Sequence, residues 1–168
     1  MDIEPSEMIR DEFFETFGSV FEHSPWIAES VWDGGVEIRH DTAAGMHEAM
    51  CNEIRRAGDE QKLALLRAHP ELAVQAGCEQ LTGHSRREQH GAGLNQCTDE
   101  EFAEFQRLNR AYREKFGFPF ILAVKGYQRR QILEIFRQRL QHSTEEEFQI
   151  ALHQVMKIGL FRLEEIFE

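Results

Sequence analysis

Apolar side chains recur at three- and four-residue steps along most of this sequence, and only four prolines interrupt the pattern. This spacing places the side chains on one face of an α-helix, where they can be buried together. The alternation typical of strands is confined to short pieces around Val36–Ile38 and Phe120–Val124, which have no convincing pairing partner. The sequence therefore predicts an all-α fold.

Capping residues, glycines and prolines indicate where the helices begin and end. We expect helices to begin at Ser6, Ser24-Pro25, Asp41 or Thr42, Asp59, Ser85, Thr98, about Tyr127 and Thr144. We expect them to end at Gly34-Gly35, near Gly58, at the His69-Pro70 break, at Gly117 and near Leu140. A short helix over residues 71–75 and a buried, extended connector over residues 118–124 complete the prediction.

The charge balance and the length limit the class of protein. The chain has 168 residues with 30 acidic and 19 basic side chains, which gives a formal charge of −11. This length suits a single domain over residues 1–168, built as a bundle of about seven to nine helices. Binding to nucleic acid or to an anionic membrane needs a basic face, so we expect neither partner.

Cysteine and histidine usage bears on compartment and cofactors. Cys51, Cys78 and Cys97 are odd in number and form no C-x-x-C pair, so a reducing compartment is the simpler interpretation. The acidic start of the sequence lacks the pattern of a secretory signal, and we expect a cytoplasmic location. The histidines lack the spacing of helical metal-ligand pairs, and no phosphate-binding glycine loop occurs. We expect neither a metal nor an organic cofactor.

His69 is the first candidate for chemistry. Pro70 must end the preceding helix and holds His69 away from helical backbone geometry. A histidine at a helix end can simply complement the helix dipole. A ring fixed beside a rigid break is also well placed to transfer a proton near neutral pH.

Glu88 is the second candidate. Ser85 and Glu88 match the S-x-x-E capping box, in which the glutamate reaches back to the backbone N–H of the serine. In the functional alternative, Glu88 points into a pocket against His69. Arg86 and Arg87 lie where cations oppose the helix dipole, which indicates either a bound anion nearby or two solvated side chains.

Arg162 lies at the edge of the apolar face of the last predicted helix. It can extend its charged end to solvent, pair with Glu165 or Glu168, or hold a carboxylate through both of its terminal nitrogens. The residue pattern alone leaves these three roles open.

Four unusual stretches occur in a fixed order: Phe21–Trp26, Arg67–Ala73, Ser85–Leu94 and Asn109–Ile121. They read FEHSPW, RAHPELA, S-x-x-E-Q followed by A-G-L, and N-x-x-Y-x-x-K-F-G-F-P-F-I. In this order they resemble the 2-oxo-4-hydroxy-4-carboxy-5-ureidoimidazoline (OHCU) decarboxylase family. The resemblance runs from about Phe14 to Arg162.

The resemblance implies an all-α fold peculiar to that family, a homodimer, and cofactor-free decarboxylation of OHCU to (S)-allantoin in urate breakdown. It assigns the catalytic roles to His69 and Glu88. It places substrate contacts on Pro70, Ser85, Gln89, Arg162 and main-chain groups near Phe120 and Ile121. Losing CO2 leaves carbanion character that the ring itself can delocalise, so this chemistry does not call for a cofactor.

The sequence departs from the family pattern at Glu71 and Asn95, where the family more often has aspartate. Neither departure falls on His69 or Glu88. Arg162 is assigned from a short Arg-Leu motif, so Arg139, which also precedes a leucine, is its rival as the substrate anchor.

Two other functions fit the same residues. One is a non-catalytic helical interaction domain, in which His69 and Glu88 are capping residues and the aromatic face of Phe102–Phe116 docks a partner. The other is a decarboxylase that acts on a related ureide.

Overall fold

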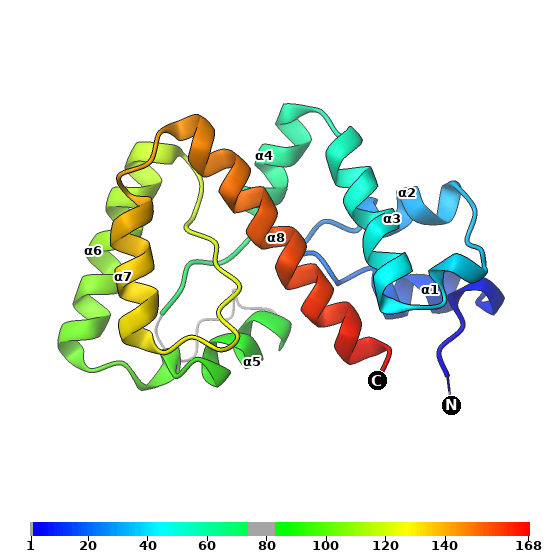
Figure 1. Ribbon diagram of the computed structural model, residues 1–168, viewed down its shortest axis with the longest axis horizontal. Coiled ribbons are helices and arrows are strands. Elements are labelled where there is room, and N and C mark those ends of the chain that lie inside the picture. The colour runs from blue at the N-terminus through cyan, green and yellow to red at the C-terminus, as the bar shows by residue number, and fades with distance from the viewer. Residues whose placement is uncertain (1, 74–82) are drawn as a thin grey trace. The chain divides into compact units, whose positions relative to one another are not determined.

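The computed structural model describes residues 2–73 and 83–168, and within these residues every regular element is a helix (Figure 1). The α-helices are α1 (Arg10–Phe17), α2 (Trp26–Asp33), α3 (Ala43–Arg56), α4 (Asp59–Arg67), α5 (Gly83–Gly91), α6 (Asp99–Phe116), α7 (Arg129–Arg139) and α8 (Thr144–Ile166). Three single-turn 3-10 helices accompany them: η1 (Pro5–Glu7), η2 (Ile38–His40) and η3 (Leu94–Gln96). The prediction of an all-α fold is confirmed.

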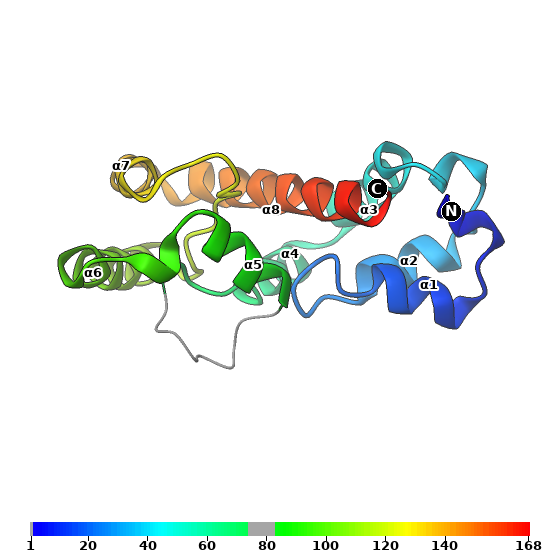
Figure 2. The ribbon, with the colours of Figure 1, turned by 90° about the horizontal axis from the view of Figure 1, so that it is seen from below.

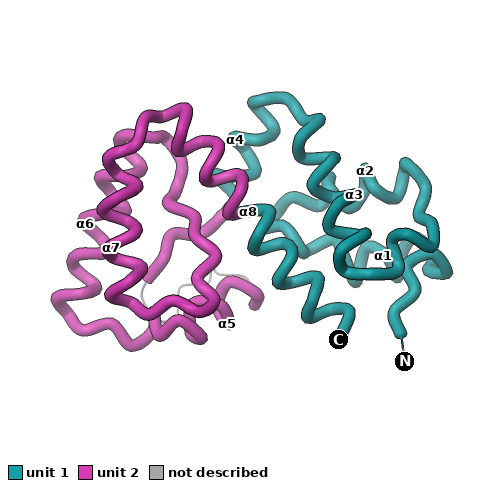
Figure 3. The backbone as a smooth tube through the Cα atoms, in the orientation of Figure 1, with its two compact units in different colours: residues 1–68, 155–168 teal, residues 69–154 magenta. Residues whose placement is uncertain are grey.

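The chain forms two compact units (Figure 3). Unit 1 comprises residues 1–68 and 155–168, and unit 2 comprises residues 69–154. Helix α8 therefore contributes residues 144–154 to unit 2 and its remaining residues to unit 1. The assignment of residues 1–168 to one domain stays a prediction.

Unit 1 packs α1, α2 and α3 around an apolar core, and Figure 2 shows α1 and α2 lying next to each other. Phe13 contacts Phe17 and Trp32 with ring centroids 5.0 and 5.3 Å apart. The C-terminal part of α8 closes this core against Phe21. A Cβ atom added to Gly159 would lie 2.6 Å from the Phe21 ring, so only glycine allows this close approach.

Unit 2 is built on α6 and α7, whose apolar faces enclose the segment that follows α6. The Tyr112 ring lies 5.9 Å from Phe136 and 5.5 Å from Phe120, in both cases edge to face, the geometry that aromatic pairs prefer. Phe120 stacks on Phe136 at 3.8 Å. The connector over residues 118–124 is buried along its whole length and has no regular structure, as predicted.

Local capping signals account for several helix ends. Thr42 accepts a hydrogen bond from the Gly45 N–H (3.0 Å) and starts α3. Thr98 and Glu101 form the predicted capping box at the start of α6. Gly117 ends α6 with φ +81°, in the left-handed region that favours glycine.

Other helix starts differ from the prediction. Ser6 is not a cap, because its backbone N–H and hydroxyl both donate to the Asp41 carboxylate (2.8 and 2.6 Å), and α1 begins only at Arg10. Thr144 already belongs to α8, and the capping oxygen is that of Ser143, which accepts from the Glu146 N–H at 3.2 Å. Residues 71–73 are not helical, and the rest of the predicted helix over 71–75 lies outside the described residues.

Candidate functional site

His69 follows Ala68, the C-cap of α4, and Pro70 prevents the helix from continuing. The side chain is only 7% exposed. Its backbone lies outside any helix, so its position depends on packing and side-chain contacts and not on helical backbone hydrogen bonds. His69 is thus a buried imidazole at a proline break, and its role in proton transfer stays a prediction.

Helix α5 presents three predicted site residues on one side. Ser85 and Gln89 are buried and Glu88 is half-buried, whereas Arg86 and Arg87 between them are exposed. Positions i, i+3 and i+4 share one face of a helix, so the buried face of α5 carries a hydroxyl, a carboxylate and a carboxamide.

Ser85 is not the N-cap of this helix. Gly83 and His84 already belong to α5, so Ser85 is an interior residue and the predicted capping box with Glu88 is wrong. The explanation of Glu88 as the reciprocal partner of a capping serine therefore does not hold. Both arginines of this helix face solvent.

Gln89 joins α5 to the segment that follows His69. Its side-chain N–H donates to the Glu71 carbonyl (3.2 Å), and its oxygen accepts from the Ala73 N–H (3.1 Å). The two predicted catalytic residues thus lie on two segments of unit 2 that are tied together by hydrogen bonds. The direct geometry between His69 and Glu88 stays a prediction.

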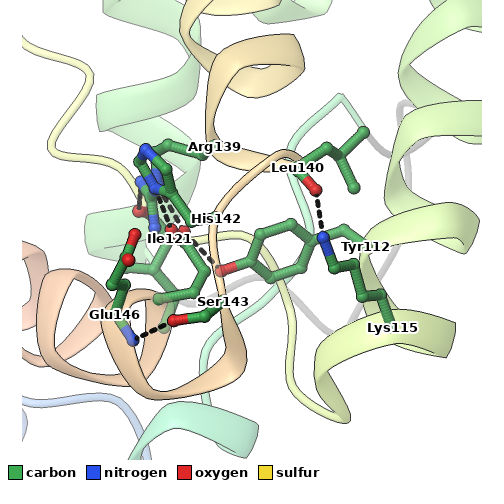
Figure 4. Close-up of polar contacts among 9 residues, drawn as sticks. Tyr112, Lys115, Ile121, Arg139, Leu140, His142, Ser143 and Glu146 are labelled. Atoms are coloured by element: carbon green, nitrogen blue, oxygen red, sulfur yellow. Dashed lines mark hydrogen bonds and ion pairs between the residues drawn. The ribbon is translucent and has the colours of Figure 1, made fainter.

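Phe120 and Ile121 lie in the buried connector, and Arg139 holds the main chain there. Arg139 Nη1 donates to the Ile121 carbonyl at 2.5 Å, and its guanidinium lies 4.4 Å from the centre of the Phe120 ring. Figure 4 shows the Arg139 side chain reaching Ile121 from α7. Arg139 therefore already donates a hydrogen bond to the main chain at Ile121.

Glu147 is the shared partner of three side chains, Tyr112, Arg139 and His142, which are labelled in Figure 4. Its side chain is 0% exposed, and one carboxylate oxygen accepts from the Tyr112 hydroxyl (2.7 Å) and from Arg139 Nε (2.5 Å). Its other oxygen lies 3.0 Å from His142 Nδ1. Burial raises the pKa of Tyr112 far above its usual range, and the neighbouring Glu147 carboxylate adds to this effect. The Tyr112 hydroxyl stays a donor.

Arg162 lies in the other unit. It is 2% exposed, and it donates to the Val20 carbonyl (2.9 Å) and to Glu22 (2.8 Å), both within unit 1. The pairing with Glu165 or Glu168 considered from the sequence is wrong, as is an extension of the guanidinium to solvent. The position of Arg162 relative to His69 and Glu88 stays a prediction.

Sequence analysis missed the acidic partners of both arginines. Glu22 precedes the His23-Ser24-Pro25 motif, and the spacing of Thr144 and Glu147 matches a capping box rather than an ion pair with Arg139. No local spacing signal identifies either residue, because each ion pair joins separate parts of the chain.

A cavity of about 380 Å³ lies in unit 1 between α2, η2 and α3. Its charged lining residues are Arg39, Glu48, Glu53 and Arg56, two of each sign. No predicted site residue lines it. This cavity is separate from the residues that carry the candidate chemistry.

The described residues offer neither a metal site nor a membrane-spanning helix. Within residues 2–73 and 83–168, no three His, Cys, Asp or Glu side chains gather closely enough to hold a metal ion. No helix in the described part of the chain is long and apolar enough to cross a bilayer. Cys51 and Cys97 are free thiols, and Cys78 lies outside the described residues.

Together, the residues of unit 2 can support proton transfer. An imidazole can donate a proton, and a carboxylate can orient it or accept a hydrogen bond from a ligand hydroxyl. The carboxamide and hydroxyl of α5 and the main chain of the connector supply neutral hydrogen-bonding groups. These are the groups with which a small polar ligand is commonly oriented.

Comparison with known proteins shows strong similarity to one family. A family model described as OHCU decarboxylase matches residues 6–164. A protein of Halalkalicoccus jeotgali named 2-oxo-4-hydroxy-4-carboxy-5-ureidoimidazoline decarboxylase is 39% identical over 94% of this chain and 86% of its own length. A mouse protein of the same name is 36% identical over 92% of this chain and 86% of its own length.

Two crystal structures share the fold. One, of an (S)-allantoin synthase, has a TM-score of 0.76 and 32% identity; the match covers 97% of this chain but about half (52%) of the other. The second, of an OHCU decarboxylase in the presence of (S)-allantoin, has a TM-score of 0.71 at 22% identity and covers 95% of this chain and 99% of the other. The predicted all-helical architecture is therefore that of solved proteins.

Proposed function

Because this chain belongs to the OHCU decarboxylase family, we propose that it converts 2-oxo-4-hydroxy-4-carboxy-5-ureidoimidazoline to (S)-allantoin and CO2 in urate degradation. The observation that carries the proposal is the buried face of α5, where Ser85, Glu88 and Gln89 lie together and Gln89 bonds the segment that follows His69. The reaction requires no cofactor in this proposal.

The reaction breaks the carbon–carbon bond between the ring and the carboxylate. The electron pair of that bond forms a C=C bond to the neighbouring ring carbon, the π pair of the C=N bond moves onto its nitrogen, which takes a proton from water, and CO2 leaves. The hydroxyl on the same ring carbon becomes a carbonyl when it loses its proton. The ring carbon that bears the ureido group gains a proton, so the substrate carboxylate and the one proton taken from water together account for all the atoms of allantoin and CO2.

His69 and Glu88 have different roles in this mechanism. Glu88 accepts a hydrogen bond from the substrate hydroxyl and orients the His69 ring, and His69 delivers a proton to one face of the flat intermediate. Delivery from one side sets the S configuration. Placing a proton donor in this way typically contributes about 10²–10⁴-fold to the rate.

The remaining predicted residues bind the substrate. Pro70 and the main chain at Phe120 and Ile121 form the walls of the site, and Ser85 and Gln89 supply polar contacts. Arg162 anchors the polar edge of the ring, since its planar guanidinium matches a carboxylate or ureide better than an ammonium group does. Arg139 stays the rival for this role, since both guanidiniums already bind protein groups: Arg139 binds Ile121 and Glu147, and Arg162 binds Val20 and Glu22.

The roles of His69 and Glu88 are tested by a matched set of variants. His69→Asn and Glu88→Gln should each lower kcat by about 10²–10⁴-fold. His90→Asn and Glu114→Gln remove an exposed group of the same kind from α5 and α6 and should leave kcat unchanged. Near-normal stereospecific turnover by His69→Asn would contradict the assignment.

We also propose that the chain forms a homodimer and works in the cytoplasm. Family membership supports the dimer, and the free thiols of Cys51 and Cys97 are typical of a reducing compartment. Light scattering coupled to size exclusion should give a mass of twice 19.6 kDa. A mass of one chain at micromolar concentration would contradict the dimer.

A further inference from the structure

The segment after His69 has no regular structure, yet three side-chain hydrogen bonds hold its main chain. Asn109 donates to the Leu72 carbonyl (3.0 Å), and the Gln89 amide binds the Glu71 carbonyl and the Ala73 N–H. Consecutive residues 71, 72 and 73 are thus each tied to a helix. Backbone groups that would be paired inside a helix or sheet are satisfied here by two carboxamides.

These contacts are buried. Asn109 and Gln89 are each 6% exposed, and Leu72 and Ala73 are buried as well. Ala73 has φ +57°, a left-handed conformation that a residue with a Cβ atom adopts only when its surroundings impose it. The carboxamides therefore hold a backbone shape that the segment would not adopt by itself.

Helices α5 and α6 both contribute to this arrangement. Asn109 and Arg113 are four residues apart on one face of α6, and Arg113 pairs with Glu71 at the same segment. Gln89 directly follows Glu88 on α5. The segment that begins with His69 and Pro70 is thus fixed to the helix that carries Glu88.

We propose that Asn109 is a positioning residue: with Gln89, it holds residues 71–73 so that His69 stays aligned with Glu88. Asn109 itself does not touch the substrate. This inference rests on the proposed function, because it concerns the alignment of the two residues that transfer protons. Misplacing a reacting group by about 1 Å can cost about 10²-fold in rate.

A positioning role predicts a particular kinetic pattern. Asn109→Leu keeps a side chain of similar size but removes the donor to the Leu72 carbonyl. We expect kcat per folded molecule to fall about 10–100-fold, while KM changes less than about 3-fold, because substrate binding does not depend on Asn109. The allantoin should also become partly racemic after subtraction of the uncatalysed background, since His69 no longer delivers its proton from one fixed side.

Gln106→Leu is the matched control. Gln106 is an exposed carboxamide three residues earlier in α6, so its substitution changes the same chemical group away from the segment. This control should keep the kcat, the KM and the product handedness of the wild type. Folding of every variant is followed by its far-UV circular dichroism and thermal melt.

The outcomes separate the inference from the proposed function. An inactive, folded wild type would refute the proposed function, and the inference with it. An active wild type with normal kcat and normal handedness in Asn109→Leu would overturn the inference alone, and a rise in KM without a change in kcat would do the same. If Asn109→Leu does not fold, Asn109→Ala removes the same donor without added bulk: unchanged kcat per folded molecule would overturn the inference, and a lower kcat with partly racemic product would support it.

Discussion

Breaking the buried ion pair of Arg139 and Glu147 should cost far more stability than breaking the more exposed pair of Arg137 and Glu104, which joins α7 to α6. Glu147 is 0% exposed and the Arg139 side chain 6%, so removing Arg139 leaves a carboxylate in the core without its counter-charge. Breaking a buried pair in this way typically costs about 3–5 kcal/mol. We therefore expect Arg139→Met to lower the free energy of unfolding by about that amount.

Arg137 provides the matched comparison. It lies two residues earlier in α7, pairs with Glu104, and has a side chain that is 45% exposed. Exposed ion pairs contribute about 0–1 kcal/mol, so Arg137→Met should cost no more than that. The same substitution at two positions of one helix therefore separates the effect of a buried counter-charge from the loss of an arginine.

Urea unfolding measured by far-UV circular dichroism gives both free energies. For a chain of this size, a loss of about 3–5 kcal/mol corresponds to a melting temperature about 6–20 °C lower. Adding Glu147→Leu to Arg139→Met removes the uncompensated charge, so the double variant should lose less than the sum of the two single losses. Equal losses for Arg139→Met and Arg137→Met, or strictly additive losses in the double variant, would refute this reasoning.

Three further predictions concern packing, thiol chemistry and substrate encounter. Gly159→Ala should cost about 1–3 kcal/mol because the new methyl group would collide with Phe21, whereas Gly91→Ala, which meets nothing within 4 Å, should leave the melting temperature nearly unchanged. Burial raises the pKa of the Cys51 thiol from 9.0 to about 11. The stability that this neutral thiol contributes below pH 9 should therefore be lost as the pH rises toward 11. A thiol reagent at pH 8 should label the less buried Cys97 before Cys51. Because the chain carries a charge of −11 and the proposed substrate is an anion, raising the salt from about 10 to 150 mM should increase kcat/KM modestly; a steep fall would show that local arginines dominate the encounter.

The sequence could predict the helices because their signals are local. Thr42 and Thr98 cap their helices through bonds to residues three positions away, and Gly117 ends α6 through its own backbone conformation. The predictions at Ser6 and Thr144 are wrong because another residue changes the role that the local pattern indicates. Ser6 binds Asp41, which is 35 residues away, and Ser143 takes the capping role from the next residue.

The candidate site was only partly predictable because many of its contacts join residues that are far apart in the sequence. The order of motifs identified His69, Glu88 and their neighbours, but the bonds that hold these segments join distant positions. Asn109 and Leu72 are 37 residues apart, and Arg162 and Glu22 are 140 apart. Asn109 is buried and its side-chain N–H donates to the Leu72 carbonyl, while its Oδ1 has no hydrogen-bond partner among the described residues. Its partner could not be named from spacing, because no periodicity connects α6 to an irregular segment.

The most direct test of the central claim follows the product as it forms. Urate oxidase and hydroxyisourate hydrolase generate the substrate from urate in the presence of this protein, and circular dichroism records the handedness of the allantoin. Uncatalysed decay protonates a flat intermediate from both sides and gives racemic product. We expect an accelerated signal of the S form that disappears in Glu88→Gln. Racemic allantoin at the uncatalysed rate, from a folded wild-type protein, would contradict the proposed activity and return His69 and Glu88 to structural roles.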